Sequence, residues 1–353
     1  MSKLFKHYIE LPKKVIVGHG VIDEVGRIVK ELVKGNKIFM VTGPHVYDIV
    51  GKHVIDELYR DEYDVEVSKV RASTIDVANE VLEYAGKFKP DIIIGLGGGK
   101  SIDIAKYIAA KLNIQFISIP TAASHDGVAS PFVSLRGTGR LTSVKAKPPI
   151  AIIADVDIIA SAPKRLLLAG AGDLIGKFTA VLDWRLAHRL KGEYYGEYAA
   201  SLSLLSAKHV LAFSDVISRG GSEAARIVIE GLISSSTAMC IAGSTRPASG
   251  SEHLFSHALD LIANYPALHG EQVALGTIMM TYLHGRKWKR IKSIIKRLGL
   301  PTTAKELGVK DVDIIKALTI AHKIRPERYT ILGETGLTWE AAEKLARVTG
   351  VID

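Results

Sequence analysis

Short hydrophobic runs alternate with amphipathic stretches through the first half of the chain. Five runs are typical of strands, at residues 37–42, 63–70, 91–97, 115–119 and 149–155. Between them, apolar residues recur at helical spacing, over residues 46–60, 75–88 and 101–112. Apolar strands separated by helices indicate a parallel sheet that helices cover on both faces. The pattern therefore predicts a Rossmann-like α/β nucleotide-binding domain.

The pattern changes after Pro163, where helical periodicity begins and continues to the end of the chain. Turn-forming residues interrupt it at 170–172, 219–221, 265–266 and 300–301, so helix breaks are expected at these four places. The segment 136–147 carries turn residues and charge, and it is either a hairpin or a mobile loop. We predict two domains, an α/β domain over 1–162 and an all-helical domain over 163–353.

A glycine run, GLGGGKSID at residues 95–103, follows a predicted strand and opens a predicted helix. Free N–H groups and the helix dipole favour a phosphate at such a position, and glycines let the backbone approach it. The run is neither a Walker A loop nor a G-x-G-x-x-G fingerprint. It is interpreted as a phosphate-binding turn of a different pattern, and the alternative is a turn that only packs strand against helix.

Candidate metal ligands lie far apart in the predicted helical domain. Asp173, His253 and His269 offer one carboxylate and two imidazoles, which leave a coordination position open, as a catalytic metal requires. A helix from 253 to 263 rises about 15 Å, and the five residues that follow can return about that far. His253 and His257 could instead be two ligands on one helix face. Spacing alone leaves both arrangements open.

A polar loop, residues 120–131, follows the strand predicted at 115–119. Ligands bind at the carboxyl ends of strands in open α/β sheets, and this loop offers hydrogen-bonding groups there. The candidates are Thr121, Ser124, His125, Asp126 and Ser130. The alternative is a polar turn without a ligand.

Composition narrows the class of protein. The chain has 353 residues, enough for two cores, and is 47% hydrophobic and 24% charged, as globular proteins are. One cysteine, Cys240, excludes an intramolecular disulfide and fits a reducing compartment. The first residues lack the features of a signal peptide, and no uncharged apolar run is long enough to span a bilayer. We expect a cytoplasmic protein without membrane insertion.

The net charge of +9 fits either nucleic acid or small anionic ligands. The densest basic segment, residues 285–299, would form a helix with an apolar stripe of Ile291, Ile294, Ile295 and Leu298. Its cations would then face water, and aromatic residues that could stack on bases are nearly absent. We expect no nucleic-acid partner.

Five segments, in order, resemble motifs of the superfamily of iron-containing alcohol dehydrogenases, glycerol dehydrogenases and dehydroquinate synthases. They are GLGGGKSID (95–103), SIPTAASHDGVASP (118–131), AGAGDLIGK (169–177), STRPASGSEHLFSHALD (244–260) and HGEQVALGT (269–277). The match is closest to the archaeal sn-glycerol-1-phosphate dehydrogenases and covers the chain from about residue 14 to at least 284. The resemblance implies a dehydroquinate synthase-like fold. It also implies reversible reduction of dihydroxyacetone phosphate to sn-glycerol 1-phosphate with NADH or NADPH, for the backbone of archaeal membrane lipids.

The resemblance also implies roles for individual residues. Asp173, His253 and His269 would hold one Zn²⁺ per subunit, and Asp126, Asp173 and His257 would contact the substrate. Asp126 and His257 are the expected catalytic residues, which order substrate hydroxyls and relay a proton. Cofactor binding is expected from Gly97, Gly98, Gly99, Lys100, Ser101, Asp103, Thr121, Ala122, Ser124 and Ser130. Members of the superfamily form dimers or larger assemblies, so a homo-oligomer is expected.

Two expectations rest on the residues themselves. A small phosphorylated substrate needs cationic partners, for which the candidates are Arg246 and Lys145, with Ser249 as a further donor. The strand 37–42 ends at Thr42 and Gly43 without a carboxylate that would repel a 2′-phosphate, so NADPH is expected to serve as well as NADH. The alternatives are a glycerol or alcohol dehydrogenase acting on an unphosphorylated polyol, and a dehydroquinate synthase-like lyase.

Overall fold

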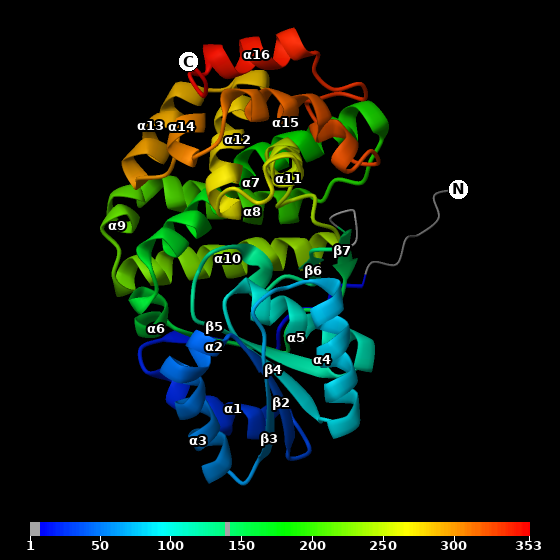
Figure 1. Ribbon diagram of the computed structural model, residues 1–353, viewed down its shortest axis with the longest axis vertical. Helices are drawn as coiled ribbons and strands as arrows, with labels where there is room; N and C mark the ends of the chain where they lie inside the picture. Colours follow the sequence, from blue (N-terminus) through cyan, green and yellow to red (C-terminus); the bar gives the residue numbers. More distant parts are fainter. Residues whose placement is uncertain (1–7, 138–141) are drawn as a thin grey trace.

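The computed structural model describes residues 8–137 and 142–353. A six-stranded sheet, all of whose strand pairs are parallel, has the order β1-β8-β5-β4-β2-β3 (Figure 1). Its strands are β1 (Lys14–Gly18), β2 (Lys37–Thr42), β3 (Asp64–Lys69), β4 (Ile92–Gly97), β5 (Gln115–Pro120) and β8 (Ala151–Asp155). The five predicted strands are present, and β1 is an edge strand that the hydrophobic pattern did not reveal.

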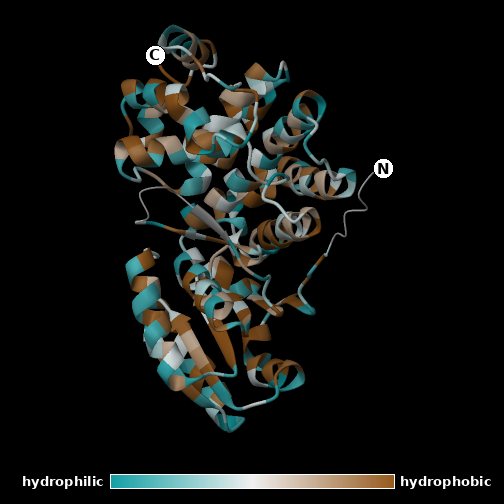
Figure 2. Cartoon of the chain, turned by 90° about the vertical axis from the view of Figure 1, so that its right-hand side faces the viewer, coloured by the Kyte–Doolittle hydropathy of each residue, from teal (hydrophilic) through white to brown (hydrophobic). Residues whose placement is uncertain are grey.

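Helices cover both faces of the sheet because its strands are apolar on both sides. Ile38 and Met40 of β2 pack in one core with α1 (Val25–Leu32) and α3 (Lys52–Arg60). The alternate residues of β2, Phe39 and Val41, pack in the other core with α4 (Ile75–Phe88) and α5 (Gly99–Leu112). Figure 2 shows the hydrophobic strands between these helices. The short α2 (Pro44–Val46) and a π-helical turn (Tyr47–Gly51) precede α3 without a break.

A separate antiparallel hairpin consists of β6 (Phe132–Leu135) and β7 (Thr142–Lys145). Of the two interpretations of residues 136–147, the structure supports the hairpin, but its first strand ends at Leu135 and only its second strand lies within that segment. Residues 138–141 of the segment lie outside the described residues.

The described residues that follow β8 form helices and turns but no strand, so the predicted α/β plus helical fold is confirmed. The helices are α6 (Val156–Ser161), α7 (Lys164–Lys191), α8 (Glu197–Ala212), α9 (Ser214–Arg219), α10 (Ser222–Ala242), α11 (Ser251–Ala263), α12 (His269–Leu283), α13 (Trp288–Leu298), α14 (Ala304–Leu307), α15 (Asp311–Ile324) and α16 (Trp339–Val348). Figure 1 shows the sheet at one end of the long axis and the last helices at the other. The domain boundary at 162/163 stays a prediction.

The helix break expected at residues 170–172 is wrong, because α7 continues through them. The glycines serve packing instead. A Cβ on Gly170 would lie 2.0 Å from the carbonyl oxygen of Ala123, in the loop after β5, and a Cβ on Gly172 would lie 2.3 Å from that of Gly270 in α12. The other three expected breaks are confirmed, since α9 ends at Arg219, α11 at Ala263 and α13 at Leu298.

Two other helices bear on the sequence-based expectations. The basic segment forms α13, and its four apolar stripe residues are buried, as predicted. One helix, α10, is long and apolar enough to cross a membrane by length and composition, with a mean hydropathy of 1.4. In this fold 72% of that apolar stretch is buried, so α10 is a core helix.

The close approach of α7 and α12 predicts an effect of a single methyl group. We expect Gly172→Ala to lower the free energy of unfolding by about 1–3 kcal/mol, because the new Cβ must displace backbone atoms of α12. Chemical denaturation measures this change. The control is Gly86→Ala in α4, where a Cβ meets no atom within 4 Å and helix propensity favours alanine. Equal effects of the two substitutions would contradict the close contact.

Candidate active site

A cleft of about 750 Å³ lies where the carboxyl ends of the strands face the helical half of the chain. The loops after β2, β4 and β5 contribute Gly43, Gly98 and Ser124 to its wall. Helices α11 and α12 contribute His253 and His269 from the other side. The position agrees with the general placement of ligands at strand ends in open α/β sheets.

The glycine run forms the turn between β4 and α5. Gly97 has a φ of +141°, which favours glycine, and a Cβ on Gly99 would overlap the His125 ring, 1.8 Å from its Nε2 atom. Gly98 to Ser101 line the cleft at the N-terminal end of α5, where backbone N–H groups have no helical partner. The turn can therefore hold an anion such as a pyrophosphate.

The other predicted cofactor residues divide into two groups. Asp103, Ala122, Ser124 and Ser130 line the cleft. Gly97 and Thr121 do not; the Thr121 N–H donates to the Gly97 carbonyl (3.0 Å), and this bond joins the ends of β4 and β5 beneath the cavity.

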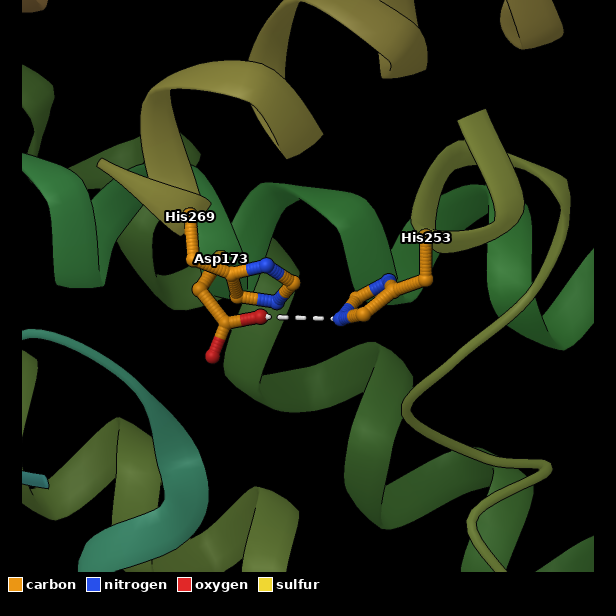
Figure 3. A group of neighbouring side chains, drawn as sticks. All are labelled: Asp173, His253 and His269. Atoms are coloured by element: carbon orange, nitrogen blue, oxygen red, sulfur yellow. Dashed lines mark ion pairs between the residues drawn. The ribbon is translucent and has the colours of Figure 1, made fainter. Parts of the chain in front are cut away.

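The three predicted metal ligands come together although they lie on three helices. Asp173 is on α7, His253 on α11, and His269 is the first residue of α12 (Figure 3). One ligand atom from each lies within 4.8 Å of the others, and Asp173 Oδ1 is 3.2 Å from His253 Nε2. Burial, together with the charge of His253, lowers the pKa of His269 to about 3, so its ring is neutral, as a ligand must be. The trio can hold a divalent metal ion.

Further buried groups fix the orientation of the two imidazoles. Glu252 is fully buried, and its carboxylate lies 2.8 Å from His253 Nδ1 while accepting from the Gly250 N–H and the Thr179 hydroxyl, both at 2.7 Å. Ser256 Oγ lies 3.2 Å from His269 Nδ1. Hydrogen bonds of this kind leave the other ring nitrogen, Nε2, directed at a metal. Sequence reasoning missed Glu252, because an acid beside a histidine in sequence does not by itself indicate contact.

Lys177 is a second residue that sequence reasoning missed. Its buried ammonium lies 2.7 Å from a carboxylate oxygen of both Asp126 and Asp173. The Asp126 N–H also donates to Asp173 (3.0 Å), and the Ser235 hydroxyl donates to the Asp126 carboxylate (3.3 Å). Burial alone would raise the pKa of Asp173, but Lys177 and His253 hold it well below its usual range. The spacing of four residues from Asp173 on one helix was the available signal.

His257, the other predicted catalytic residue, lines the cleft beside the trio. Its ring stacks on that of His269, with 5.5 Å between centroids and 20° between planes. Its buried Nδ1 atom has no hydrogen-bond partner among the described residues. Burial, followed by the charges of the neighbouring histidines, lowers the pKa of His257 well below its usual range. His257 is therefore neutral near pH 7. Among the described residues, the group of ligand atoms close enough to share a metal ion is Asp173, His253 and His269, without His257.

The predicted phosphate-binding residues do not all reach the cleft. Ser249 lines it. Arg246 is buried outside it, where its guanidinium pairs with Glu193 (2.6 Å) and donates to the Tyr329 carbonyl (2.9 Å). Lys145 is exposed at the end of β7 and does not line the cleft. The structure thus gives no geometric support for Arg246 or Lys145 as substrate-binding residues.

Solved structures share this fold at low sequence identity. A probable glycerol dehydrogenase from Sinorhizobium meliloti 1021 aligns with a TM-score of 0.81 and 20% identity over 98% of each chain. A glycerol dehydrogenase from Schizosaccharomyces pombe aligns with a TM-score of 0.78 and 22% identity, over 98% of this chain and 90% of that one. The profile of the iron-containing alcohol dehydrogenase family matches residues 16–163. The fold is therefore that of the iron-containing alcohol dehydrogenases.

Curated relatives are more similar. A glycerol-1-phosphate dehydrogenase (NAD(P)+) of Hyperthermus butylicus is 58% identical over 98% of this chain and 99% of its own length. Another of the same name, from Staphylothermus marinus, is 59% identical over 98% of each. The chain belongs to the glycerol-1-phosphate dehydrogenase family, as the sequence motifs predicted.

The contact between Glu252 and His253 predicts that Glu252 is a positioning residue for the metal site. We expect Glu252→Gln to weaken Zn²⁺ binding roughly 10- to 100-fold, because a neutral amide at His253 Nδ1 makes the imidazole a less basic ligand than the carboxylate does. Competition with a chromogenic chelator measures the affinity. Glu230→Gln is the control, since Glu230 is exposed on α10 and pairs only with Arg226. Unchanged Zn²⁺ affinity in the Glu252 variant would refute its role.

Proposed function

We propose that this protein reduces dihydroxyacetone phosphate to sn-glycerol 1-phosphate, reversibly, with NADH or NADPH as the reductant. The observation that carries the proposal is that the glycine turn, His253 and His269 line one cleft, and that Asp173 lies within 4.8 Å of both histidines. The name shared by relatives at 58% and 59% identity supports the same reaction. In it the ketone takes up a hydride and a proton and becomes a secondary alcohol, while the nicotinamide is oxidised.

We propose that the trio holds one Zn²⁺ per subunit. The donor set fits, because one carboxylate and two imidazoles suit a divalent ion and leave an open position for a substrate oxygen. An ion bound there would supply Lewis acidity at the ketone oxygen. The reduced nicotinamide would supply the hydride, and the protein would position it.

The remaining roles belong to side chains of the cleft. Gly98 to Ser101 would bind the cofactor pyrophosphate, with Ala122, Ser124 and Ser130 along the rest of the cofactor. Neutral His257 would hydrogen-bond a substrate hydroxyl and pass a proton between it and solvent. Asp126 would position the substrate through a carboxylate whose orientation Lys177 fixes. Asp103, paired with buried Lys106 (3.5 Å), would support the cofactor side.

The proposal extends to the setting of the enzyme. We place the domain boundary at 162/163, and we propose a cytoplasmic homo-oligomer that acts on a small phosphorylated substrate without a nucleic-acid partner. The product would supply the glycerophosphate backbone of archaeal membrane lipids.

Metal removal tests the reaction. We expect NADPH oxidation with dihydroxyacetone phosphate to stop after chelation and to return with Zn²⁺, because the carbonyl would lose its electrophilic activation. The product is assigned with an enzyme specific for the sn-3 isomer, which should refuse it. Turnover that gives the sn-3 product would retain a dehydrogenase and reject the stereochemistry. Activity on glycerol without activity on the phosphate ester would favour a polyol dehydrogenase.

Cofactor choice is tested at the end of β2. Gly43 lines the cleft, and a Cβ there would meet no atom closer than 3.9 Å, so an aspartate fits. We expect Gly43→Asp to lower the ratio of kcat/KM for NADPH over NADH at least about tenfold, because a carboxylate would repel the 2′-phosphate. Gly43→Asn, of the same size without the charge, is the control. An unchanged ratio in the aspartate variant would refute this placement of the cofactor.

A further inference from the structure

Arg325 is a cation in the wall of the cleft that no motif indicated. It follows the last residue of α15, a helix that packs against α11, and its side chain lines the cleft together with His257, Thr245 and Ser249. Its guanidinium forms no hydrogen bond or ion pair with any of the described residues. Arginine presents five N–H donors, and partial burial of a guanidinium without acceptors is costly. Burial lowers the pKa of Arg325, in keeping with that cost.

The two neighbouring arginines, Arg246 and Arg328, both donate to acceptors in the protein, which distinguishes Arg325 from them. Arg246 pairs with Glu193 and donates to the Tyr329 carbonyl. Arg328 donates to the Ser249 carbonyl and to the Thr245 hydroxyl oxygen. Arg246, Arg325 and Arg328 therefore make the potential at this end of the cleft positive. Glu193 offsets part of that charge, because it pairs with Arg246. Of these three arginines, only Arg325 lines the cavity.

Arg328 gives this end of the cleft a defined shape. It holds both ends of the turn from Thr245 to Ser249, in which the Ala248 and Ser249 N–H groups donate to the Thr245 carbonyl (3.0 and 2.9 Å). Thr245 and Ser249, each of which carries a hydroxyl, line the same cavity as Arg325. A fork of N–H donors and two hydroxyls matches the oxygens of a phosphate monoester.

We propose that Arg325, with the Thr245 and Ser249 hydroxyls, binds the phosphate of the substrate, a phosphate monoester dianion. The inference rests on the proposed function and deepens it by assigning the phosphate subsite. His257 stacks on His269 and lines the same cleft as Arg325. In this arrangement the substrate binds with its phosphate at Arg325 and its carbonyl at the trio. Lys100 and Arg71, at the strand ends, remain for the phosphates of the cofactor.

The test compares Arg325→Gln with a control, Arg290→Gln. Arg290 is exposed on α13 and does not line the cleft. Both are assayed with dihydroxyacetone phosphate and with unphosphorylated dihydroxyacetone. We expect Arg325→Gln to raise KM for the phosphate ester roughly 10- to 100-fold, because a charge-assisted pair is lost. Activity with dihydroxyacetone should change less than about twofold, since that substrate lacks the phosphate. Arg325→Lys should recover part of the loss by restoring the charge without the fork.

Binding of inorganic phosphate separates this inference from the proposed function. Calorimetry on the Zn²⁺-loaded protein saturated with NADP+ reports only sites that the cofactor leaves open. Weaker phosphate binding in Arg325→Gln, with unchanged Zn²⁺ content and NADP+ affinity, supports the subsite even if the wild-type protein does not reduce dihydroxyacetone phosphate. Unchanged phosphate affinity and unchanged KM for the ester overturn the subsite, while leaving the proposed function intact.

Discussion

The buried ammonium of Lys177 is the interaction on which the cleft depends. It lies between Asp126, in the loop after β5, and Asp173 on α7, so a single cation joins the sheet side to the helical side. Without it, two carboxylates would face each other in a desolvated site, and at least one would take up a proton. With Glu252 beside His253, three carboxylates and one ammonium surround the two imidazoles, and this excess of carboxylates suits a divalent cation.

Glycines decide how closely the layers can approach around this ion pair. Gly170 lets α7 touch the loop that carries Asp126, and Gly172 lets α7 touch the start of α12, where His269 lies. Glycine has a low helix propensity, so the sequence pattern predicted a helix break at residues 170–172. The cost in helix propensity is offset by contacts that bring Asp173 within coordinating distance of both histidines.

The charges of the cleft are arranged by position. Lys100 and Arg71 lie toward the strand ends, the trio lies on the helical side, and Arg325 follows α15 in the wall of the cleft that also contains His257. Among the described residues, none of these three cations has an ion-pair partner, so each can interact with an anionic ligand. A protein that binds two anionic ligands at once needs two separate positive regions. Lys100 and Arg71 form one region and Arg325 forms the other, in the wall that also contains neutral His257. Composition gives only the net charge of +9, whereas the fold shows that these three cations line the cleft.

The strand–helix alternation determined the α/β sheet, because hydrophobic periodicity depends only on neighbouring residues. The glycine run and the trio could be named from local sequence and from resemblance to a family. Tertiary structure alone decided the rest. Arg246 and Arg325 are both arginines, yet Arg246 forms an ion pair with Glu193, whereas Arg325 has no ion-pair partner among the described residues. Lys177 and β1 likewise gained their roles from partners distant in sequence. Local patterns specify what a segment can become, whereas the electrostatic role of a side chain depends on which groups the completed fold places beside it.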